Sequence, residues 1–600
     1  MVELKEQVVR AVLEKRYSDL DKLLGQIAST PMYRDDYELL NIRAANEFRK
    51  DNQEKAIEIY RLSIEKNKYQ VLAYKDLGLI FEALNRWHDG LDIIEKGLKF
   101  SPQDTHLLEV KAVLLHGAKR YDESEVVYKK LLSIHPEASA YWTSLGNIYL
   151  EITEIDKALE CHRKAVNYNP NSDTAVFNFI TTMHYHPRFK NEDIHPILTE
   201  YSKLFPYSKI PEFKLNVGTE SARIKVGFLS NGFRNNPVGQ MILPALSELD
   251  KNQFDLFFYS TSLQEDYITE NLRSIAKEYS VVANLDDDQL YTKLQKDDLD
   301  VLFELSGFHA GSRMSLISRK PVPVIIKWVG GLINSTKIRT VDYLLSDRVE
   351  TPPGVDDEYS EKLIRMPTDY ICYRLPPYIP EVAGLPALKN GYVTYGCLNN
   401  ASKINDQHIE RWIKILNKVP DSRILLKSFQ FESQYLCTNI KEKFYAKGID
   451  PKRLILEGSS PHQAHLNTYN RIDIALDTWP YSGGLTTVES LAMGVPVITL
   501  PGPTFAGRHS ASHLAHAGMP ELIAESASHY VDLAVSLSSD LESLATIRSH
   551  LRRILENSAV CDATSFSKYL AEALKLVVDK NRSGIPPTAI SWDLESGIRA

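Results

Sequence analysis

Apolar positions change their spacing once along this 600-residue chain, close to residue 220. Before that point they recur at the spacing of amphipathic helices. After it, strand-sized apolar runs at 224–229, 254–259, 300–305 and 324–328 alternate with helical stretches such as 238–249. Alternating strands and helices predict a parallel sheet that is covered by helices. We therefore expect an all-helical part joined to an α/β part.

The helical part contains a repeat with a period of 34 residues. Three kinds of residue keep this period: prolines (Pro102, Pro136, Pro170), small residues (Gly78, Ala112, Gly146 and Gly90, Ser124, Ala158) and larger apolar residues (Phe81, Leu115, Tyr149). Small residues let two helices approach closely, and proline ends the second helix of each pair. This is the tetratricopeptide pattern, and its phasing over three units argues against a run of unrelated amphipathic helices.

The repeat sets the expected boundaries of the helical part. Residues 37–70 form a weaker earlier unit, and the first thirty-odd residues are expected to be a cap or a degenerate repeat. We predict an α-solenoid over 1–172 and a helical linker over 173–220, where the repeat phase is lost.

The α/β part divides into two successive series. We predict a first Rossmann-like lobe over 221–385, a second over 386–580 and a tail over 581–600. The strands of the second series are expected at 393–396, 423–427, 454–457, 472–476 and 497–500, and the proline-rich stretch 349–390 is expected to be a connection. Ligands of such sheets bind at the carboxyl ends of the strands, so a cleft between the lobes is the expected site.

Composition narrows the function classes. The net charge of −8 and the pI of about 6.1 imply no basic face, which argues against nucleic acid as a partner. The apolar runs are strand-sized, so no transmembrane span is expected. The five cysteines form no CxxC pair, and the charged N-terminus lacks the apolar core of a secretory signal. We therefore expect a cytoplasmic protein without a structural metal site.

One segment of the second series combines a glycine turn with polar side chains that suit a phosphate ligand. Residues 472–476 are expected to be a buried strand, and Gly483 and Gly484 follow in a turn that permits close approach of a ligand. Thr486 and Thr487 place hydroxyls where a helix N-terminus presents free amides, and Glu489 lies within the next turn. These groups suit a diphosphate-sugar, with donors for the phosphates and a carboxylate for sugar hydroxyls. A plain β/α turn with a capping hydroxyl is the alternative interpretation.

Three segments together resemble a known family. Residues 334–367, 390–404 and 476–494 are similar to the donor-phosphate region of the O-GlcNAc transferases and of the related SPINDLY-type O-fucosyltransferases. Residues 395–404 and 484–489 look nearer to SPINDLY and bacterial relatives than to the animal enzyme. The resemblance implies a tetratricopeptide solenoid followed by a GT-B transferase with two Rossmann-like lobes, so the fold class is α plus α/β.

The resemblance also implies roles for residues of the second lobe. Lys403 matches the lysine that contacts the donor diphosphate, and Asn400 matches a polar residue that faces the phosphates. His465 matches a histidine that packs on the nucleotide base, and Glu489 resembles the acidic residue that holds the ribose. His462 stands where a lysine flanks the uracil in the animal enzyme. The alternative interpretation is that Lys403 is an exposed lysine on a loop and that the histidines lie on the surface without a binding role.

The first lobe departs from the family pattern. The loop at 230–239 carries Asn236 where the family has a histidine, and asparagine can form hydrogen bonds but cannot act as a base. His309 is a spare catalytic candidate near the same cleft. Arg508 and His509 follow another glycine-containing turn, where they either face the phosphates or cap the next helix.

The implied reaction is transfer of GlcNAc from UDP-GlcNAc to Ser/Thr of a protein acceptor, with inversion and without a metal ion or cofactor. Two alternatives stay open at this stage. One is O-fucosylation from GDP-fucose, and the other is a scaffold without activity. The solenoid groove is expected to recruit the acceptor protein or peptide, and repeats of this kind also allow homo-oligomers.

Overall fold

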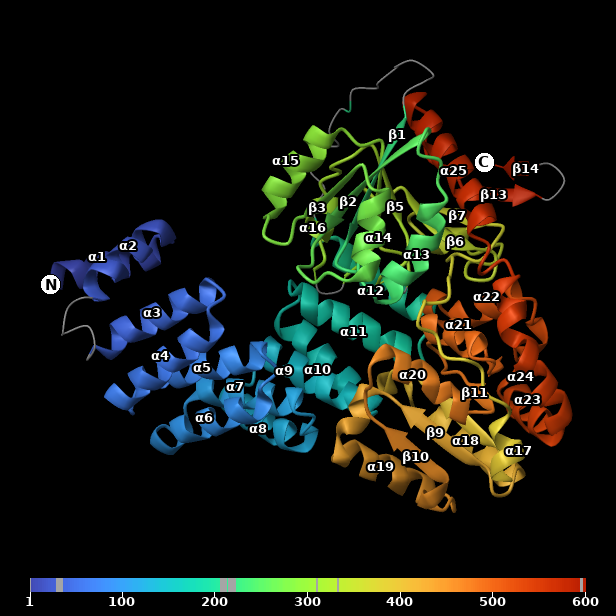
Figure 1. The fold of residues 1–600 in the computed structure, drawn as a ribbon, viewed down its shortest axis with the longest axis horizontal. Coiled ribbons are helices and arrows are strands. Elements are labelled where there is room, and N and C mark those ends of the chain that lie inside the picture. Colours follow the sequence, from blue (N-terminus) through green and yellow to red (C-terminus); the bar gives the residue numbers. More distant parts are fainter. Residues whose placement is uncertain are drawn as a thin grey trace. The chain divides into compact units, whose positions relative to one another are not determined.

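Paired helices build the first part of the computed structural model (Figure 1). The structure describes residues 2–28, 36–205, 213, 223–308, 311–331, 334–593 and 597–599. It contains two compact units, residues 1–148 with 433–435 and residues 149–432 with 436–600. The helices of the first unit are α1 Val2–Leu13, α2 Tyr17–Ala28, α3 Tyr37–Arg49, α4 Gln53–Lys66, α5 Val71–Ala83, α6 Trp87–Phe100, α7 Thr105–Gly117 and α8 Tyr121–Ile134, and α9 Ser139–Glu151 crosses the unit boundary.

Small residues allow the helices of the repeat to pack closely. A Cβ atom on Gly78 of α5 would lie 2.7 Å from Ile94 Cδ1 of α6, and one on Gly90 of α6 would lie 2.6 Å from Leu114 Cδ2 of α7. Ser124 is fully buried, and its hydroxyl donates to the carbonyl of Ala112 at 2.7 Å. These contacts explain the 34-residue spacing of small residues and confirm the predicted helical repeats.

Two helices of the predicted linker belong to the core of the first lobe. After α10 Ile155–Tyr168 follow α11 Asp173–Tyr185 and α12 Asn191–Ser202. Buried side chains of α11 and α12, among them Ile180 and Leu198, share one hydrophobic cluster with residues of the first sheet. This apolar face fixes the two helices against the lobe. Most of the later part of the predicted linker, 206–212 and 214–220, lies outside the described residues.

The first lobe is built on a nine-stranded sheet with the order β14-β13-β7-β6-β5-β4-β1-β2-β3. The strands are β1 Ile224–Ser230, β2 Phe254–Ser260, β3 Glu278–Val281, β4 Val301–Glu304, β5 Val324–Lys327, β6 Tyr343–Asp347, β7 Lys362–Met366, β13 Ile590–Asp593 and β14 Gly597–Arg599. Every neighbouring pair is parallel except β13 and β14. The helices between these strands are α13 Pro237–Ser247, α14 Tyr267–Ile275, α15 Asp287–Asp297 and α16 Met314–Ile317.

The C-terminal segment differs from the prediction. Residues 590–599 were expected in a tail, but β13 pairs with β7 and so extends the first sheet. Helix α25 (Ala563–Arg582) was expected in the second lobe, but it lies beside the strands of the first sheet (Figure 1). Its Phe566 and Leu574 pack in the core of that sheet, and Phe566 stacks on Trp328 with ring centroids 5.8 Å apart. Strand β7 likewise lies inside the stretch expected to be a connection.

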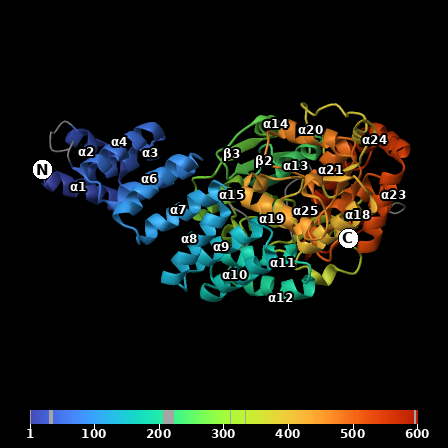
Figure 2. The ribbon, with the colours of Figure 1, turned by 90° about the horizontal axis from the view of Figure 1, so that it is seen from below.

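The second lobe contains a five-stranded parallel sheet with the order β10-β9-β8-β11-β12. Its strands are β8 Thr394–Cys397, β9 Arg423–Lys427, β10 Leu454–Glu457, β11 Ile474–Leu476 and β12 Val497–Ile498. Its helices are α17 Pro386–Asn390, α18 Asp406–Lys418, α19 Gln434–Tyr445, α20 His462–Thr468, α21 Leu485–Ala492, α22 His509–His516, α23 Ala527–Ser539 and α24 Leu541–Glu556. Helices α18 and α23 lie side by side (Figure 1, Figure 2).

Short 3-10 helices connect these elements. They are η2 Asp356–Glu358, η3 Ala401–Lys403, η4 Phe429–Glu432, η5 Pro451–Arg453, η6 Tyr469–Arg471, η7 Phe505–Gly507 and η8 Pro520–Leu522. The predicted architecture of a helical repeat followed by two α/β lobes is confirmed.

A buried ion pair shapes the loop that follows β5. Lys327 Nζ lies 3.0 Å from Glu304 Oε2 and donates to the carbonyls of Val329 and Gly330 at 2.7 and 2.6 Å. Burial lowers the pKa of Lys327, while the Glu304 carboxylate opposes this shift. The amides of Ser306 and Gly307 donate to the same carboxylate. The pair therefore joins the loops after β4 and β5 at the carboxyl edge of the sheet.

Replacing Lys327 by Met should destabilise the second unit by about 3–5 kcal/mol, because the substitution leaves the Glu304 carboxylate buried without its cation. The measurement is the urea midpoint of unfolding, followed by tryptophan fluorescence. Lys418→Met is the matched control, since Lys418 pairs with Asp532 at the exposed surface and its loss should cost less than about 1 kcal/mol. Equal effects of the two substitutions would contradict the role of the buried pair.

Candidate active site

The carboxyl ends of β8 and β11 meet at a buried carboxylate. Asp477, which follows β11, is 4 % exposed. Its Oδ1 accepts from the Gly483 amide at 2.7 Å and from Asn399 Nδ2 at 3.0 Å, and its Oδ2 accepts from the Thr499 hydroxyl at 2.7 Å. Because β8 and β11 are neighbours in the sheet, one side chain reaches the loops after both strands. Asp477 therefore fixes the glycine turn relative to the loop that carries Lys403.

Further hydrogen bonds complete this junction. The Thr486 hydroxyl donates to Asn399 Oδ1 at 2.5 Å, and Lys403 Nζ donates to the carbonyl of Ser482 at 2.6 Å. The ammonium also lies 4.2 Å from the centroid of the Tyr481 ring. Burial lowers the pKa of Lys403 to about 8, and Asp477 opposes this shift. An ammonium keeps further donor positions beyond the bond to Ser482, so Lys403 can bind an anion.

The junction borders a cavity of about 410 Å³. The first lobe supplies the start of α13, the loop after β5 and Tyr370, and the second lobe supplies the junction and the start of α22. The lining residues are Pro237, Val238, Met241, Val329, Gly330, Gly331, Tyr370, Asn399, Asn400, Lys403, Tyr481, Gly484, Leu485, Thr486 and His509. The N-terminus of α21, whose first amides lack helical partners, and the Lys403 ammonium both favour a bound anion.

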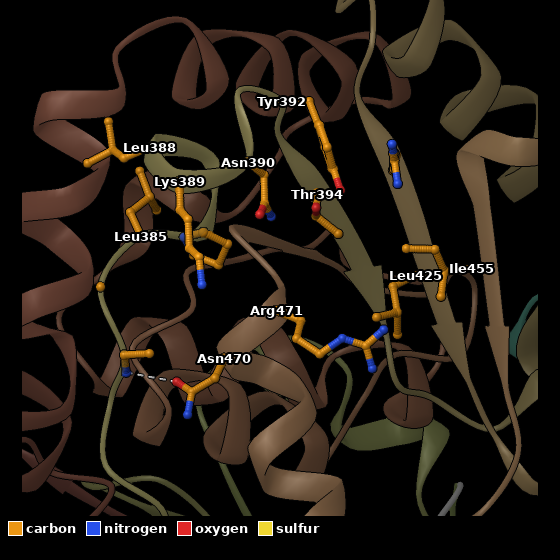
Figure 3. Close-up of a pocket in the computed structure, with 14 residues that line it drawn as sticks. Leu385, Leu388, Lys389, Asn390, Tyr392, Thr394, Leu425, Ile455, Asn470 and Arg471 are labelled. Atoms are coloured by element: carbon orange, nitrogen blue, oxygen red, sulfur yellow. Dashed lines mark hydrogen bonds between the residues drawn. The ribbon is translucent and has the colours of Figure 1, made fainter.

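A larger cavity, of about 840 Å³, lies at the amino ends of β8 and β9 (Figure 3). Its wall includes Thr394, Leu425 and Arg471, and the guanidinium of Arg423 lies 3.9 Å from the centroid of the Tyr392 ring. Sheets of this type bind ligands at the carboxyl ends of their strands, where the smaller cavity lies. The smaller cavity also contains the polar groups singled out in the sequence, so it is the candidate active site.

A second group of predicted residues forms a hydrogen-bonded chain between the lobes. Glu489 Oε1 lies 2.7 Å from His462 Nε2, and His462 Nδ1 lies 2.8 Å from the hydroxyl of Tyr378. Asn235 Nδ2 of the first lobe donates to the same hydroxyl at 2.9 Å. The ring of His465 lies 6.5 Å from that of His462, centroid to centroid, and burial lowers the pKa of His465. The structure thus brings His462, His465 and Glu489 together on α20 and α21.

Other predicted residues have structural contacts. Asn236 Oδ1 accepts from the Gly239 amide at 3.1 Å and so caps α13. Arg508 donates to the carbonyls of Glu350 and Pro503. The Thr487 hydroxyl lies 2.7 Å from that of Ser510. The backbone of Gly483 is held by Asp477, and Asn400 Oδ1 accepts from Gln430 Nε2 at 2.6 Å.

His309, the spare candidate, lies outside the described residues. Three polar or aromatic residues of the cavity wall were not among the predicted site residues: Tyr370, Asn399 and Tyr481. His509, which the sequence singled out together with Arg508, also lies in the wall. Tyr370 lies in the stretch expected to be a connection, and no local pattern marks it. Asn399 and Tyr481 lie inside segments that carry the family resemblance, which is the signal that points to them.

Two Rossmann-like lobes that share a polar cavity at the carboxyl ends of their strands are the arrangement expected of a two-lobed glycosyltransferase. The profile of glycosyl transferase family 41 matches residues 205–373 and 384–570, and the tetratricopeptide repeat profile matches residues 139–172. The chain belongs to glycosyl transferase family 41.

Relatives of this chain include plant and bacterial proteins. The probable UDP-N-acetylglucosamine--peptide N-acetylglucosaminyltransferase SPINDLY of Oryza sativa subsp. japonica is 28 % identical over 73 % of this chain and 48 % of its own length. SPINDLY of Arabidopsis thaliana is 32 % identical over 61 % of this chain and 40 % of its own length. The structure of a mutant O-GlcNAc transferase of Thermobaculum terrenum matches with a TM-score of 0.78 and 27 % identity, over 85 % of this chain and 98 % of that one.

The chain spans about half the length of the curated plant relatives that it matches. Within the described ranges, no helix is both long and apolar enough to cross a membrane.

Replacing Asp477 by Ala should release the glycine turn, because Gly483 and Asn399 lose their shared acceptor. Amide hydrogen exchange of the peptide 481–487 should become faster. Asp473→Ala is the matched control, since this buried carboxylate accepts from the Ala387 and Thr394 amides at the opposite end of β11. The control should leave exchange at 481–487 unchanged, and unchanged exchange in Asp477→Ala would contradict the role given to this carboxylate.

Proposed function

We propose that the chain is a protein O-glycosyltransferase that transfers GlcNAc from UDP-GlcNAc to Ser or Thr hydroxyls, with inversion and without a metal ion. The observation that carries this proposal is the position of Lys403 beside the glycine turn, in the cavity between the lobes. The names of the plant relatives and of the bacterial enzyme support the donor and the acceptor class.

The chemistry follows from charge development on the leaving group. When the bond between the anomeric carbon and the diphosphate breaks, negative charge grows on the phosphate oxygens. Lys403 and the free amides at the start of α21 stabilise that charge, which is the work that a metal ion performs in other transferases. Direct attack by the acceptor hydroxyl on the opposite face of the sugar inverts the anomeric carbon and needs no enzyme nucleophile.

The remaining predicted residues are assigned to the nucleoside and to the phosphates of the donor. Glu489 is proposed to hold the ribose, since it is almost fully buried and its Oε2 is not used in the bond to His462. His465 is proposed to pack on the base, with His462 beside it. Asn400 and Thr486 line the cavity and are proposed to face the phosphates.

The helical repeats are proposed to recruit the protein acceptor, because stacked helix pairs of this type form extended surfaces that bind peptides and partner proteins.

The donor is tested by thermal denaturation of the whole chain with UDP, UDP-GlcNAc, GDP and GDP-fucose, because a ligand that binds the folded state raises the melting temperature. UDP and UDP-GlcNAc should raise it. A shift with GDP and GDP-fucose alone would assign the donor to the second candidate, which the similarity of residues 395–404 to SPINDLY-type O-fucosyltransferases favours. No shift with any nucleotide would contradict the proposed glycosyltransferase activity and favour a scaffold without activity.

UDP affinity should fall as the pH rises through about 8, because Lys403 loses its charge there in the free protein. The lysine is protonated below its pKa, so the affinity should be constant on the acid side of that value. The measurement is isothermal titration of UDP across pH 6.5–9.5. Lys403→Arg should remove the fall in UDP affinity, because arginine stays charged. Lys403→Met should reduce turnover by about 10²–10³-fold. An unchanged pH dependence in Lys403→Arg would refute the assignment.

Deleting residues 1–134, which removes α1 to α8, should reduce transfer to protein acceptors far more than it reduces hydrolysis of UDP-GlcNAc. Both rates are measured on the same preparation, with UDP release as the readout for hydrolysis. Retained hydrolysis shows that the remaining chain is folded. Equal loss of both activities would contradict a recruiting role.

A further inference from the structure

One histidine of the cavity wall is oriented by a buried carboxylate. His509, the first residue of α22, has its Nδ1 2.7 Å from Glu350 Oε1 and 3.1 Å from the hydroxyl of Tyr370. Its ring packs against Tyr370 and Tyr481, with centroids 5.6 and 6.0 Å away. Among the described residues, its Nε2 has no hydrogen-bond partner. A carboxylate that accepts from Nδ1–H leaves Nε2 as the nitrogen that can take a proton.

The carboxylate of this pair is held inside the protein. Glu350 follows β6 and is fully buried, and its Oε2 has no partner among the residues that the structure describes. Arg508 donates to the backbone carbonyl of Glu350, which fixes this residue next to the start of α22. The pair thus joins a loop of the first lobe to a helix of the second lobe at the cavity.

We propose that His509, oriented by Glu350, is the general base of the transfer reaction. This inference rests on the proposed function and adds a catalytic residue to it. As the acceptor oxygen bonds to the anomeric carbon, its proton passes to His509 Nε2. The bond from that carbon to the diphosphate oxygen breaks, and the electron pair leaves with UDP. The proton passes to water after the products leave.

The charge state of the imidazole suits a base. Burial lowers the pKa of His509, and the nearby His513 and Lys403 act in the same direction, so the ring is neutral near pH 7. Burial raises the pKa of Glu350, with Asp347 and Asp369 acting in the same direction and Arg508 opposing them. Because a carboxyl group keeps an acceptor oxygen when it is neutral, Oε1 can accept from Nδ1–H in either charge state. The carboxyl group and the hydroxyl of Tyr370 are both placed to stabilise the ring when it gains a proton.

The other titratable groups of the cavity wall are less suited to this role. Burial raises the pKa values of Tyr370 and Tyr481, so both stay phenols, and Lys403 is the cation proposed for the diphosphate. Asn236, at the position where the family has a histidine, caps α13 and cannot take a proton. Within the described wall, His509 is therefore the group that combines an available nitrogen with an orienting carboxylate.

The test uses the full chain and hydrolysis of UDP-GlcNAc, in which water replaces the acceptor hydroxyl. His509→Gln should lower kcat by about 10²–10⁴-fold while its affinity for UDP stays within about twofold of the unmodified chain. The unmodified chain should lose activity at acid pH as the base becomes protonated, and His509→Gln should lose this acid limb. Glu350→Gln should move the limb to lower pH, because the group that stabilises the protonated ring is changed.

His513→Gln is the matched control. His513 lies on the same helix as His509 and pairs with Asp369, but it does not line the cavity. It should keep the acid limb, at the same pH or a higher one, because His513 lowers the pKa of His509. A His509→Gln chain that binds UDP and retains full kcat with the acid limb would overturn the proposal, and so would an unmodified chain that binds UDP without hydrolysing UDP-GlcNAc. Failure of the unmodified chain to bind UDP would instead contradict the proposed function, and with it this inference.

Discussion

The hydrogen bonds of Asp477 are the constraint on which the active-site geometry depends. A parallel sheet places the carboxyl ends of β8 and β11 next to each other, but the loops that follow them would be free without a shared anchor. Asp477 supplies that anchor through the Gly483 amide and the Asn399 side chain. Lys403 then lies against the carbonyl of Ser482, so the cation and the glycine turn face one cavity. A buried carboxylate with several donors is costly to disturb, which makes the arrangement rigid before a ligand arrives.

The first lobe contributes positioned backbone and aromatic side chains to the same cavity. Lys327 and Glu304 hold the loop after β5, in which Gly330 has a φ of +47° and would place a Cβ atom 1.7 Å from the carbonyl oxygen of Leu305. That close approach requires glycine. Asn236 caps α13 and thereby sets the start of the helix that lines the cavity, a structural role in place of acid/base chemistry. Proton transfer must then come from another part of the wall.

Much of the fold follows from local patterns in the sequence. The 34-residue spacing predicted the helical repeats because close helix packing demands small residues at fixed positions, as at Gly78 and Gly90. Apolar runs predicted β1 and β9 because buried parallel strands are apolar on both faces. Strand β7 was missed because it lies between proline-rich stretches, and β13 because its pairing with β7 joins residues more than 200 positions apart.

Those parts of the candidate site that lie within short sequence segments could also be predicted. The family resemblance and the glycine turn indicated Lys403, Thr486 and Glu489, because each of these residues lies in a short segment that carries the pattern. The pairing of His509 with Glu350 is a contact between distant segments of the two lobes, and no short motif carries it. The hydrogen-bonded chain from Glu489 to Asn235 is invisible in the sequence for the same reason.

Amide hydrogen exchange of the full chain with and without UDP tests the central claim, that the nucleotide sugar binds in the cavity between the lobes. UDP should slow exchange in the segments 399–403 and 482–487, which border that cavity. Slower exchange at 383–394 instead, in the wall of the larger cavity at the amino ends of β8 and β9, would contradict it, and so would no change in either region.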